Sequence, residues 1–227
     1  MATHLDLEEQ EQLDQLKAFW KQYGNLITWV ITLVLAGFAA WNGWTWWQRD
    51  QAVKASAMYE ELDRAVQAAD ADKAGRVFTD LKDRYPKTTY TAQAAMQAAK
   101  LQYDKGQAEA ARASLAWAAD NAADDEYRDL ARLRLAGLQM EAKQFAEAAK
   151  TLDAVKLPDF AALQADRRGD LFVLQAKPDL ARAEYQKAYA AMNSKQDYRR
   201  LIEAKLATLG VASVDDAASA AAKGAAK

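Results

Sequence analysis

The chain has 227 residues, and its 30 Lys and Arg residues nearly balance 32 Asp and Glu residues. The basic residues alternate with acidic ones and form no basic stripe, which argues against nucleic-acid binding. The absence of cysteine excludes disulfides, thiolate nucleophiles and Cys-ligated metals. Since His4 is the only histidine, a multi-histidine zinc site is also excluded, and no cofactor is expected.

A long apolar stretch near the start, LITWVITLVLAGFAAWNGWTWWQ, predicts a membrane-spanning helix. Residues 26–47 carry no formal charge. As a helix rising about 1.5 Å per residue they would cover about 33 Å, which matches the hydrocarbon core of a bilayer. Aromatic side chains of the kind found at the lipid headgroups lie at both ends: Trp20, Tyr23, Trp44, Trp46 and Trp47.

The same stretch has a second interpretation as a cleaved secretion signal. Such a signal begins with positive charge and has an apolar run of about 7 to 15 residues. Here the leading segment is acidic and the apolar run is longer, so a retained anchor is favoured. The orientation of the anchor stays open, because Lys17 and Lys21 on one side are matched by Arg49 and Lys54 on the other.

Small residues within the predicted span favour contact with a second membrane helix. Ala36 and Ala40, like Ala39 and Gly43, are separated by one helical turn, which lets two helices approach closely. Asn42 has two interpretations. It either forms a hydrogen bond across such a contact or lies near enough to the interface to stay hydrated.

Helices are predicted to continue after the span. Residues 49–70 keep the helical period and are expected to extend the membrane helix outward, with five side chains on one face: Val53, Ala57, Tyr59, Leu62 and Val66. A further helix ends at Pro86, because the residue before a proline is disfavoured in helical geometry.

A recurring sequence predicts stacked helical pairs. AEAAR at 108–112 returns 38 residues later as AEAAK at 146–150, and LARAE follows at 180–184. This spacing is close to the tetratricopeptide unit of about 34 residues. Each occurrence follows a turn and a run of helical period, and an irregular helical bundle is the alternative. Leucines are expected to fill the layers between pairs: Leu101, Leu115, Leu133, Leu135, Leu138, Leu152, Leu171 and Leu174.

The predicted fold is therefore all-α, with an N-terminal single transmembrane helix followed by a tetratricopeptide-like α-solenoid of stacked helical hairpins. A last helix, from Lys195 to Gly210, is expected to be a polar-faced cap. The Ala-rich tail has too few large apolar groups to build a core and is expected to be disordered. The expected segments are an N-terminal segment 1–25, the span 26–47, a repeat domain 48–210 and the tail 211–227.

Three stretches resemble a known family: the acidic lead LDLEEQEQLDQLKAFWKQYGN, the block LRLAGLQMEAKQFAEAAKTLD at 133–153, and ADRRGDLFVLQAKPDLARAEYQKA at 165–188. Together with the tryptophan-rich span, they resemble the YfgM family of ancillary SecYEG translocon subunits over nearly all of residues 5–211. The tail after Val211 departs from the family pattern.

The resemblance implies a place and partners for the chain. The place is the bacterial inner membrane, crossed once, with the N-terminus in the cytoplasm and the repeats in the periplasm. The implied partners are the SecYEG translocon, a PpiD-type periplasmic chaperone, exported protein chains and membrane lipid. The resemblance implies no catalytic residue, cofactor or metal.

Four side chains are candidates for protein binding. Arg168 and Gly169 coincide with an Arg-Gly pair of the family. On one interpretation Arg168 faces the concave surface and binds a partner. On the other it pairs with Asp166, Asp170 or a neighbouring helix while Gly169 permits close packing. The remaining candidates are aromatic, and most of them are expected to pack between repeats: Tyr103, Trp117 and Tyr127.

The predicted function is a membrane-anchored protein-binding module, an ancillary subunit of the Sec translocon that helps hand exported chains to a periplasmic chaperone. Tethering to the membrane would raise the effective concentration of binding surface and client, so weak contacts would suffice. One alternative is an envelope scaffold that organises partners without chaperone activity. Another is an enzyme built on carboxylates in the groove, and a third keeps the repeats in the cytoplasm.

Overall fold

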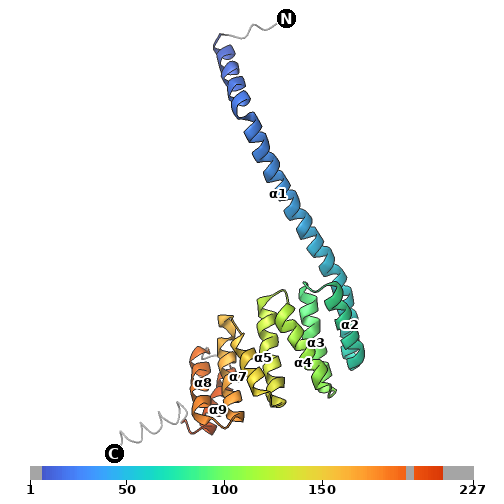
Figure 1. Ribbon diagram of the computed structural model, residues 1–227, viewed down its shortest axis with the longest axis vertical. Helices are drawn as coiled ribbons and strands as arrows, with labels where there is room; N and C mark the ends of the chain where they lie inside the picture. The colour runs from blue at the N-terminus through green and yellow to red at the C-terminus, as the bar shows by residue number, and fades with distance from the viewer. Residues whose placement is uncertain (1–6, 193–196, 212–227) are drawn as a thin grey trace, which may run out of the picture. The chain divides into compact units, whose positions relative to one another are not determined.

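The computed structural model describes residues 7–192 and 197–211 (Figure 1). Within these ranges the chain is helical and has no strand, which confirms the predicted all-α class. Two compact units divide between Gln51 and Ala52. Of the predicted tail 211–227, only Val211 lies in the described part of the chain, and Lys195 lies outside it.

The described part of the first unit consists of α1 as far as Gln51. The helix starts at Leu7 and continues without a break to Gln67 (Figure 1). Its apolar side chains are exposed, as Phe38 and Trp41 illustrate with exposed fractions of 67% and 71%. A helix of a soluble protein would bury such a surface. Among the described helices, α1 is the one with the length and apolar composition needed to cross a membrane.

The second unit contains the end of α1 and the remaining helices. Leu62 on the end of α1 is fully buried in a core shared with α2 and α3. The remaining elements follow in chain order: α2 (Ala71–Arg84), α3 (Thr89–Asp104), α4 (Ala108–Asn121), α5 (Asp125–Glu141), α6 (Phe145–Asp153), the 3-10 turn η1 (Pro158–Phe160), α7 (Ala161–Leu174), α8 (Pro178–Ala191) and α9 (Asp197–Thr208).

Each hairpin turns on one residue with left-handed backbone geometry, and these residues are Ala69, Gly106, Lys143 and Ala176. In each turn the next backbone N–H donates to the carbonyl five residues earlier, as from Gln107 to Gln102 at 2.8 Å. This pattern is the Schellman motif, which satisfies carbonyl groups left open at a helix end. The helical pairs therefore share one turn geometry.

The turns define the register of the repeat. Five residues after each turn residue lies an alanine with no exposed surface, and these alanines are Ala74, Ala111, Ala148 and Ala181. Successive repeats are thus 37, 37 and 33 residues long. The 38-residue match of AEAAR to AEAAK is out of register by one position. A fully buried alanine lets two helices approach closely, so burial fixes the register where sequence similarity does not.

Most of the predicted core leucines are buried, but Leu174 is not. Leu174 is 54% exposed at the last residue of α7, so the helices of the described part of the chain leave this end of α7 uncovered. The predicted face of the α1 extension also needs correction. Val53 and Ala57 are exposed, whereas Ala55 and Ala65 are buried together with Leu62.

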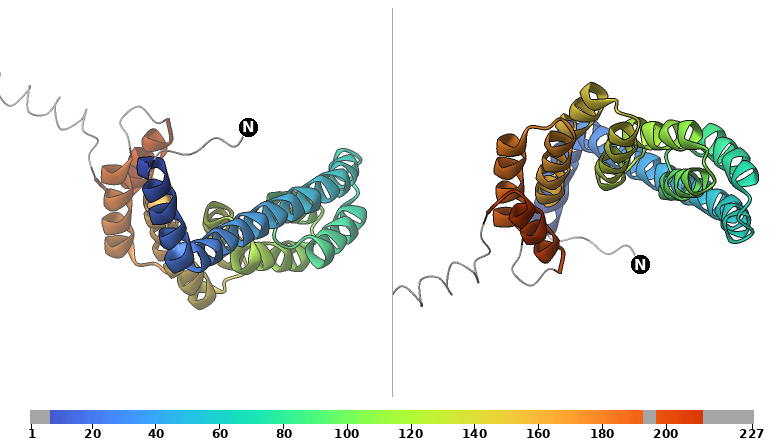
Figure 2. Two further views of the ribbon diagram at one scale, coloured as in Figure 1. Left: turned by 90° about the horizontal axis from the view of Figure 1, so that it is seen from above. Right: turned by 90° about the horizontal axis from the view of Figure 1, so that it is seen from below.

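The helices of the second unit follow an arc from α2 to α8 (Figure 2, right). The first helices of successive hairpins approach one another, since α5 contacts both α3 and α7. The second helices α4, α6 and α8 have no comparable contact with one another. In a curved stack the closer row lies on the inner side, so α3, α5 and α7 form the inner row.

Candidate functional site

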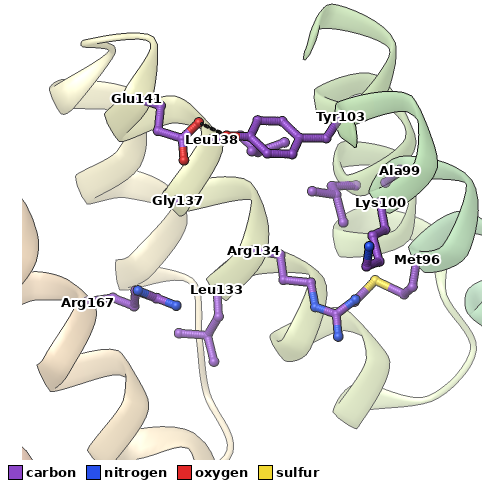
Figure 3. Close-up of a pocket in the computed structure, with 11 residues that line it drawn as sticks. Met96, Ala99, Lys100, Tyr103, Leu133, Arg134, Gly137, Leu138, Glu141 and Arg167 are labelled. Atoms are coloured by element: carbon purple, nitrogen blue, oxygen red, sulfur yellow. Dashed lines mark hydrogen bonds between the residues drawn. The ribbon is translucent and has the colours of Figure 1, made fainter. Parts of the chain in front are cut away.

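A hollow of about 400 Å³ opens on the inner row around α5 (Figure 3). We call it the α5 hollow. It lies wholly within the second unit, and α3, α4, α5 and α7 contribute side chains to it. The lining residues are Met96, Ala99, Lys100, Tyr103, Leu115, Leu133, Arg134, Gly137, Leu138, Glu141 and Arg167.

The floor of the α5 hollow is apolar. Met96, Leu115 and Leu133 are buried in the helix packing, yet each keeps a surface toward the hollow. Leu138 is half-buried and extends this surface along α5. Met is flexible and polarisable, so such a floor adapts to apolar side chains of different shape.

One end of the hollow is closed by a contact between α3 and α5. The Tyr103 hydroxyl donates to the Glu141 carboxylate at 2.7 Å, as Figure 3 shows. The hydrogen bond to Glu141, followed by the charge of that carboxylate, raises the pKa of Tyr103. Tyr103 thus stays a neutral hydrogen-bond donor at physiological pH.

The other polar groups of the lining are cationic. Lys100 pairs with Asp104 at 2.6 Å, and Arg167 pairs with Asp170 at 3.2 Å. Arg134 is exposed and has no ion-pair partner among the described residues. In Figure 3 the two arginines lie near Leu133, away from the bond that closes the hollow. The hollow therefore has an apolar floor and one cationic side.

Gly137 lies on α5 between the cationic side and the closed end. A Cβ atom built there meets no heavy atom within 4 Å. A glycine inside a helix costs about 1 kcal/mol relative to alanine. Packing does not account for this glycine, and its effect is to leave the backbone of α5 open to the hollow.

Arg168 and Gly169 lie outside this hollow. The Arg168 guanidinium pairs with Asp153, at the end of α6, at 2.5 Å. A Cβ atom on Gly169 would overlap the ring of Tyr185 on α8. This geometry agrees with the second interpretation, in which the arginine pairs with a neighbouring helix and the glycine permits close packing.

The three aromatic candidates have different surroundings. Trp117 packs edge-on against Phe78, with ring centroids 5.4 Å apart. The Tyr127 hydroxyl accepts a hydrogen bond from the Gln93 amide at 2.8 Å, and its ring packs against the core. Tyr103 is 41% exposed and lines the α5 hollow. Of the predicted binding residues, the structure places Tyr103 alone in this hollow.

The predicted contact residues of the span are all exposed along α1: Ala36, Ala39, Ala40, Asn42 and Gly43. The Asn42 amide donates to the Phe38 carbonyl at 2.9 Å, so its own helix provides one acceptor. Of the predicted belt, Trp20, Tyr23, Trp46 and Trp47 are exposed and Trp44 stacks on Trp47 with ring centroids 5.2 Å apart. Their depth in a membrane stays a prediction.

Sequence reasoning missed Arg134, Gly137 and Arg167. The two arginines occupy the same repeat position, nine residues before the turn residues Lys143 and Ala176. A periodic arginine was therefore visible in the sequence. Recognising it required the repeat register seen in the structure, in which Gly106 and Lys143 are 37 residues apart. The sequence match of 38 residues differs from this register by one position.

The hollow offers no pair of carboxylates for acid–base catalysis, because Glu141 is the one carboxylate in its lining. Within residues 7–192 and 197–211, no group of three or more His, Asp or Glu side chains is placed to hold a metal ion. The arrangement is suited to holding a ligand by apolar contact and charge.

Comparison with known proteins agrees with this architecture. The family model of the tetratricopeptide repeat-like domain matches residues 17–211. The chain is 30% identical over 203 residues to the ancillary SecYEG translocon subunit of Haemophilus influenzae, covering 89% of this chain and 98% of the relative. It is 29% identical over 213 residues to the Neisseria gonorrhoeae protein of the same name, covering 92% of this chain and 100% of the relative.

A third relative, the ancillary SecYEG translocon subunit of Escherichia coli, is 29% identical over 178 residues, or 78% of this chain and 85% of the relative. The matches cover the apolar helix and the hairpins together, as the resemblance noted in the sequence predicts. The chain therefore belongs to the YfgM family of ancillary SecYEG translocon subunits, whose repeats are tetratricopeptide-like.

Proposed function

We propose that this chain is a membrane-anchored protein-binding subunit of the Sec translocon. Its relatives are named ancillary SecYEG translocon subunits, and the sequence match covers nearly their whole length. The proposed place is the inner membrane, crossed once by residues 26–47, with residues 1–25 in the cytoplasm and residues 48–210 in the periplasm. The exposed apolar surface of α1 supports the anchor.

The proposed task is to hold exported chains briefly and pass them to a PpiD-type periplasmic chaperone. The observation that carries it is the α5 hollow, where an apolar floor and unbalanced charge lie open on the inner row of a helical solenoid. Newly exported chains expose apolar and charged side chains together. A shallow surface of this kind binds them weakly, which allows release.

Site-specific photocrosslinking in living cells tests this function. A photoreactive amino acid at Tyr103 should label exported chains, and one at Ala40 should label a translocon subunit or another membrane helix. A probe at Arg84, which is exposed on α2 and does not belong to the hollow lining, is the control. If Tyr103 labels no more exported protein than Arg84 does, the hollow is not the binding surface.

An aggregation assay separates this function from that of an envelope scaffold. The full chain in lipid nanodiscs should slow the aggregation of an unfolded reporter protein, whereas a scaffold for folded partners should not. Protease added to spheroplasts tests the orientation. It should digest the second unit from outside, and protection of that unit would place the repeats in the cytoplasm.

A further inference from the structure

The charges of the α5 hollow are not balanced within the chain. Lys100 is neutralised by Asp104, and Glu141 keeps its negative charge at the closed end of the hollow, where it accepts a hydrogen bond from Tyr103. Arg134 has no ion-pair partner in the described part of the chain. On the same helix Arg128 and Arg132 each pair with an aspartate three residues earlier, so Arg134 differs from its neighbours.

Arg167 extends this cationic side. It shares one contact of 3.2 Å with Asp170 and is 43% exposed. A guanidinium has five N–H donors, so most of those on Arg167 remain available. Since Arg134 and Arg167 occupy the same position in successive repeats, α5 and α7 present two guanidinium groups in one row along the inner side. Together they offer N–H donors to more than one acceptor.

Gly137 provides an independent indication of a ligand. It lies one turn after Arg134 on α5, in the hollow lining. No neighbouring atom lies close enough to exclude a side chain at this position. The other two helical glycines described in this unit are different, because a Cβ atom on either of them would lie against a neighbouring side chain. A Cβ on Gly169 would overlap Tyr185, and one on Gly75 would lie 3.1 Å from Gln102. The open backbone at Gly137 lets a bound chain lie close to α5.

We infer that the α5 hollow selects extended protein segments in which a large apolar side chain lies next to acidic side chains. The apolar side chain would rest on Met96, Leu133 and Leu138, and the carboxylates would pair with Arg134 and Arg167. The inference rests on the proposed function, because it specifies which segments of a client the hollow prefers. Charge complementarity chooses the occupant, since the open charges on the side of Arg134 and Arg167 are positive and lie away from Glu141 (Figure 3), and the apolar floor suits a side chain such as leucine.

Peptide binding to the full chain in zwitterionic lipid nanodiscs tests this preference. Three fluorescent dodecapeptides share a central leucine pair, which is flanked by two aspartates, by two asparagines or by two lysines. Fluorescence anisotropy should show binding of the aspartate peptide at least about fivefold tighter than the asparagine peptide, and weakest binding of the lysine peptide. The preference should shrink as salt rises, because exposed charges are screened.

Two variants locate the binding. Gly137→Leu places an apolar side chain in the hollow from a position where an added Cβ meets no heavy atom within 4 Å. It should weaken binding of the aspartate peptide by more than about tenfold, while helix content stays unchanged because leucine favours helix. Arg134→Gln should reduce the preference for aspartate over asparagine by about threefold. Arg84→Gln removes another exposed arginine charge, from α2 outside the hollow lining, and is the matched control with no expected effect.

Equal affinity for the aspartate and asparagine peptides would overturn the inference, as would unchanged binding in Gly137→Leu. Displacement of the aspartate peptide by phosphatidylglycerol vesicles, but not by unlabelled peptide, would assign the cations to lipid headgroups and overturn it too. If the Tyr103 probe still labels exported chains in those cases, the proposed function survives and only the acidic preference is wrong. If the aspartate preference and the labelling of exported chains from Tyr103 are both absent, the proposed function is wrong as well.

Discussion

Asp166 is a fully buried carboxylate that joins the last hairpin to α9. It accepts a hydrogen bond from Tyr198 and an ion pair from Lys205, each at 2.7 Å. The same Lys205 ammonium pairs with Asp170 at 2.7 Å, and Tyr185 donates to Asp170. A buried charge is tolerated only when such partners replace water. At the scale of single residues, this cluster holds α9 against α7 and α8.

Removing the cation tests the cluster. Lys205→Met leaves Asp166 buried without its ion-pair partner, so the free energy of unfolding should fall by about 3 kcal/mol. Urea denaturation followed by circular dichroism of the full chain in detergent measures it. Lys187→Met, which breaks the more exposed pair with Glu184 on α8, should cost less than about 1 kcal/mol. Equal losses in the two variants would contradict the assignment.

Tyr198 makes the cluster sensitive to alkaline pH. Burial, together with the hydrogen bond to Asp166, raises the pKa of Tyr198 from about 10 to about 12. The folded chain therefore keeps a proton that the unfolded chain loses between these values. The stabilisation is complete below pH 10 and declines as pH rises toward 12. Tyr198→Phe should reduce this decline when urea midpoints at pH 8 and pH 11 are compared, and an unchanged decline would contradict it.

At the scale of helices, two glycines with opposite surroundings predict opposite effects. Gly169→Ala drives a methyl group into the ring of Tyr185 and should lower the free energy of unfolding by about 1–3 kcal/mol. Gly137→Ala meets no neighbour and should raise it by up to about 1 kcal/mol. Urea denaturation of both variants checks the pair. Destabilisation of the same size in both would mean that α7 and α8 are not packed as described.

The hairpin turns give a second prediction at this scale. Ala176 adopts left-handed geometry at φ 56°, and Gly106 adopts it at φ 76°. This geometry is strained by a Cβ atom but not in glycine. Ala176→Gly should therefore stabilise the chain by about 1 kcal/mol, whereas Gly106→Ala should destabilise it by a similar amount. Thermal unfolding measures both, and shifts in the same direction would exclude the shared turn geometry.

At the scale of the whole molecule, the exposed apolar surface of α1 predicts stable membrane insertion. Alkaline carbonate should leave the wild-type chain in the membrane pellet. The double variant Val34→Arg, Phe38→Arg places two charges near the middle of the predicted span, each costing about 2.5–3.5 kcal/mol on insertion. It should shift the chain to the supernatant. The control is the double variant Glu8→Arg, Glu9→Arg, which places the same two arginines outside the predicted span by reversing two charges, and it should stay in the pellet.

The sequence by itself determined the helical class, the apolar helix and the repeated pairs. These follow from local rules. The length of the uncharged stretch matches the thickness of a bilayer core. The helical period of apolar residues can be recognised within short stretches of sequence, and small residues recur where two helices approach each other. Most core leucines were found for the same reason, because burial within a hairpin depends on near neighbours along the chain.

Only the tertiary structure decided the register of the repeats and the position of the binding surface. Ala111 and Ala148 define the register through contact with other helices, which an alanine-rich sequence cannot distinguish from its neighbours. Leu174 is apolar like a core residue but is exposed, because neither α8 nor α9 covers the end of α7. Arg168 pairs inside the fold, whereas Arg134 lies open. Whether an arginine has an ion-pair partner depends on contacts between segments that are distant in the sequence.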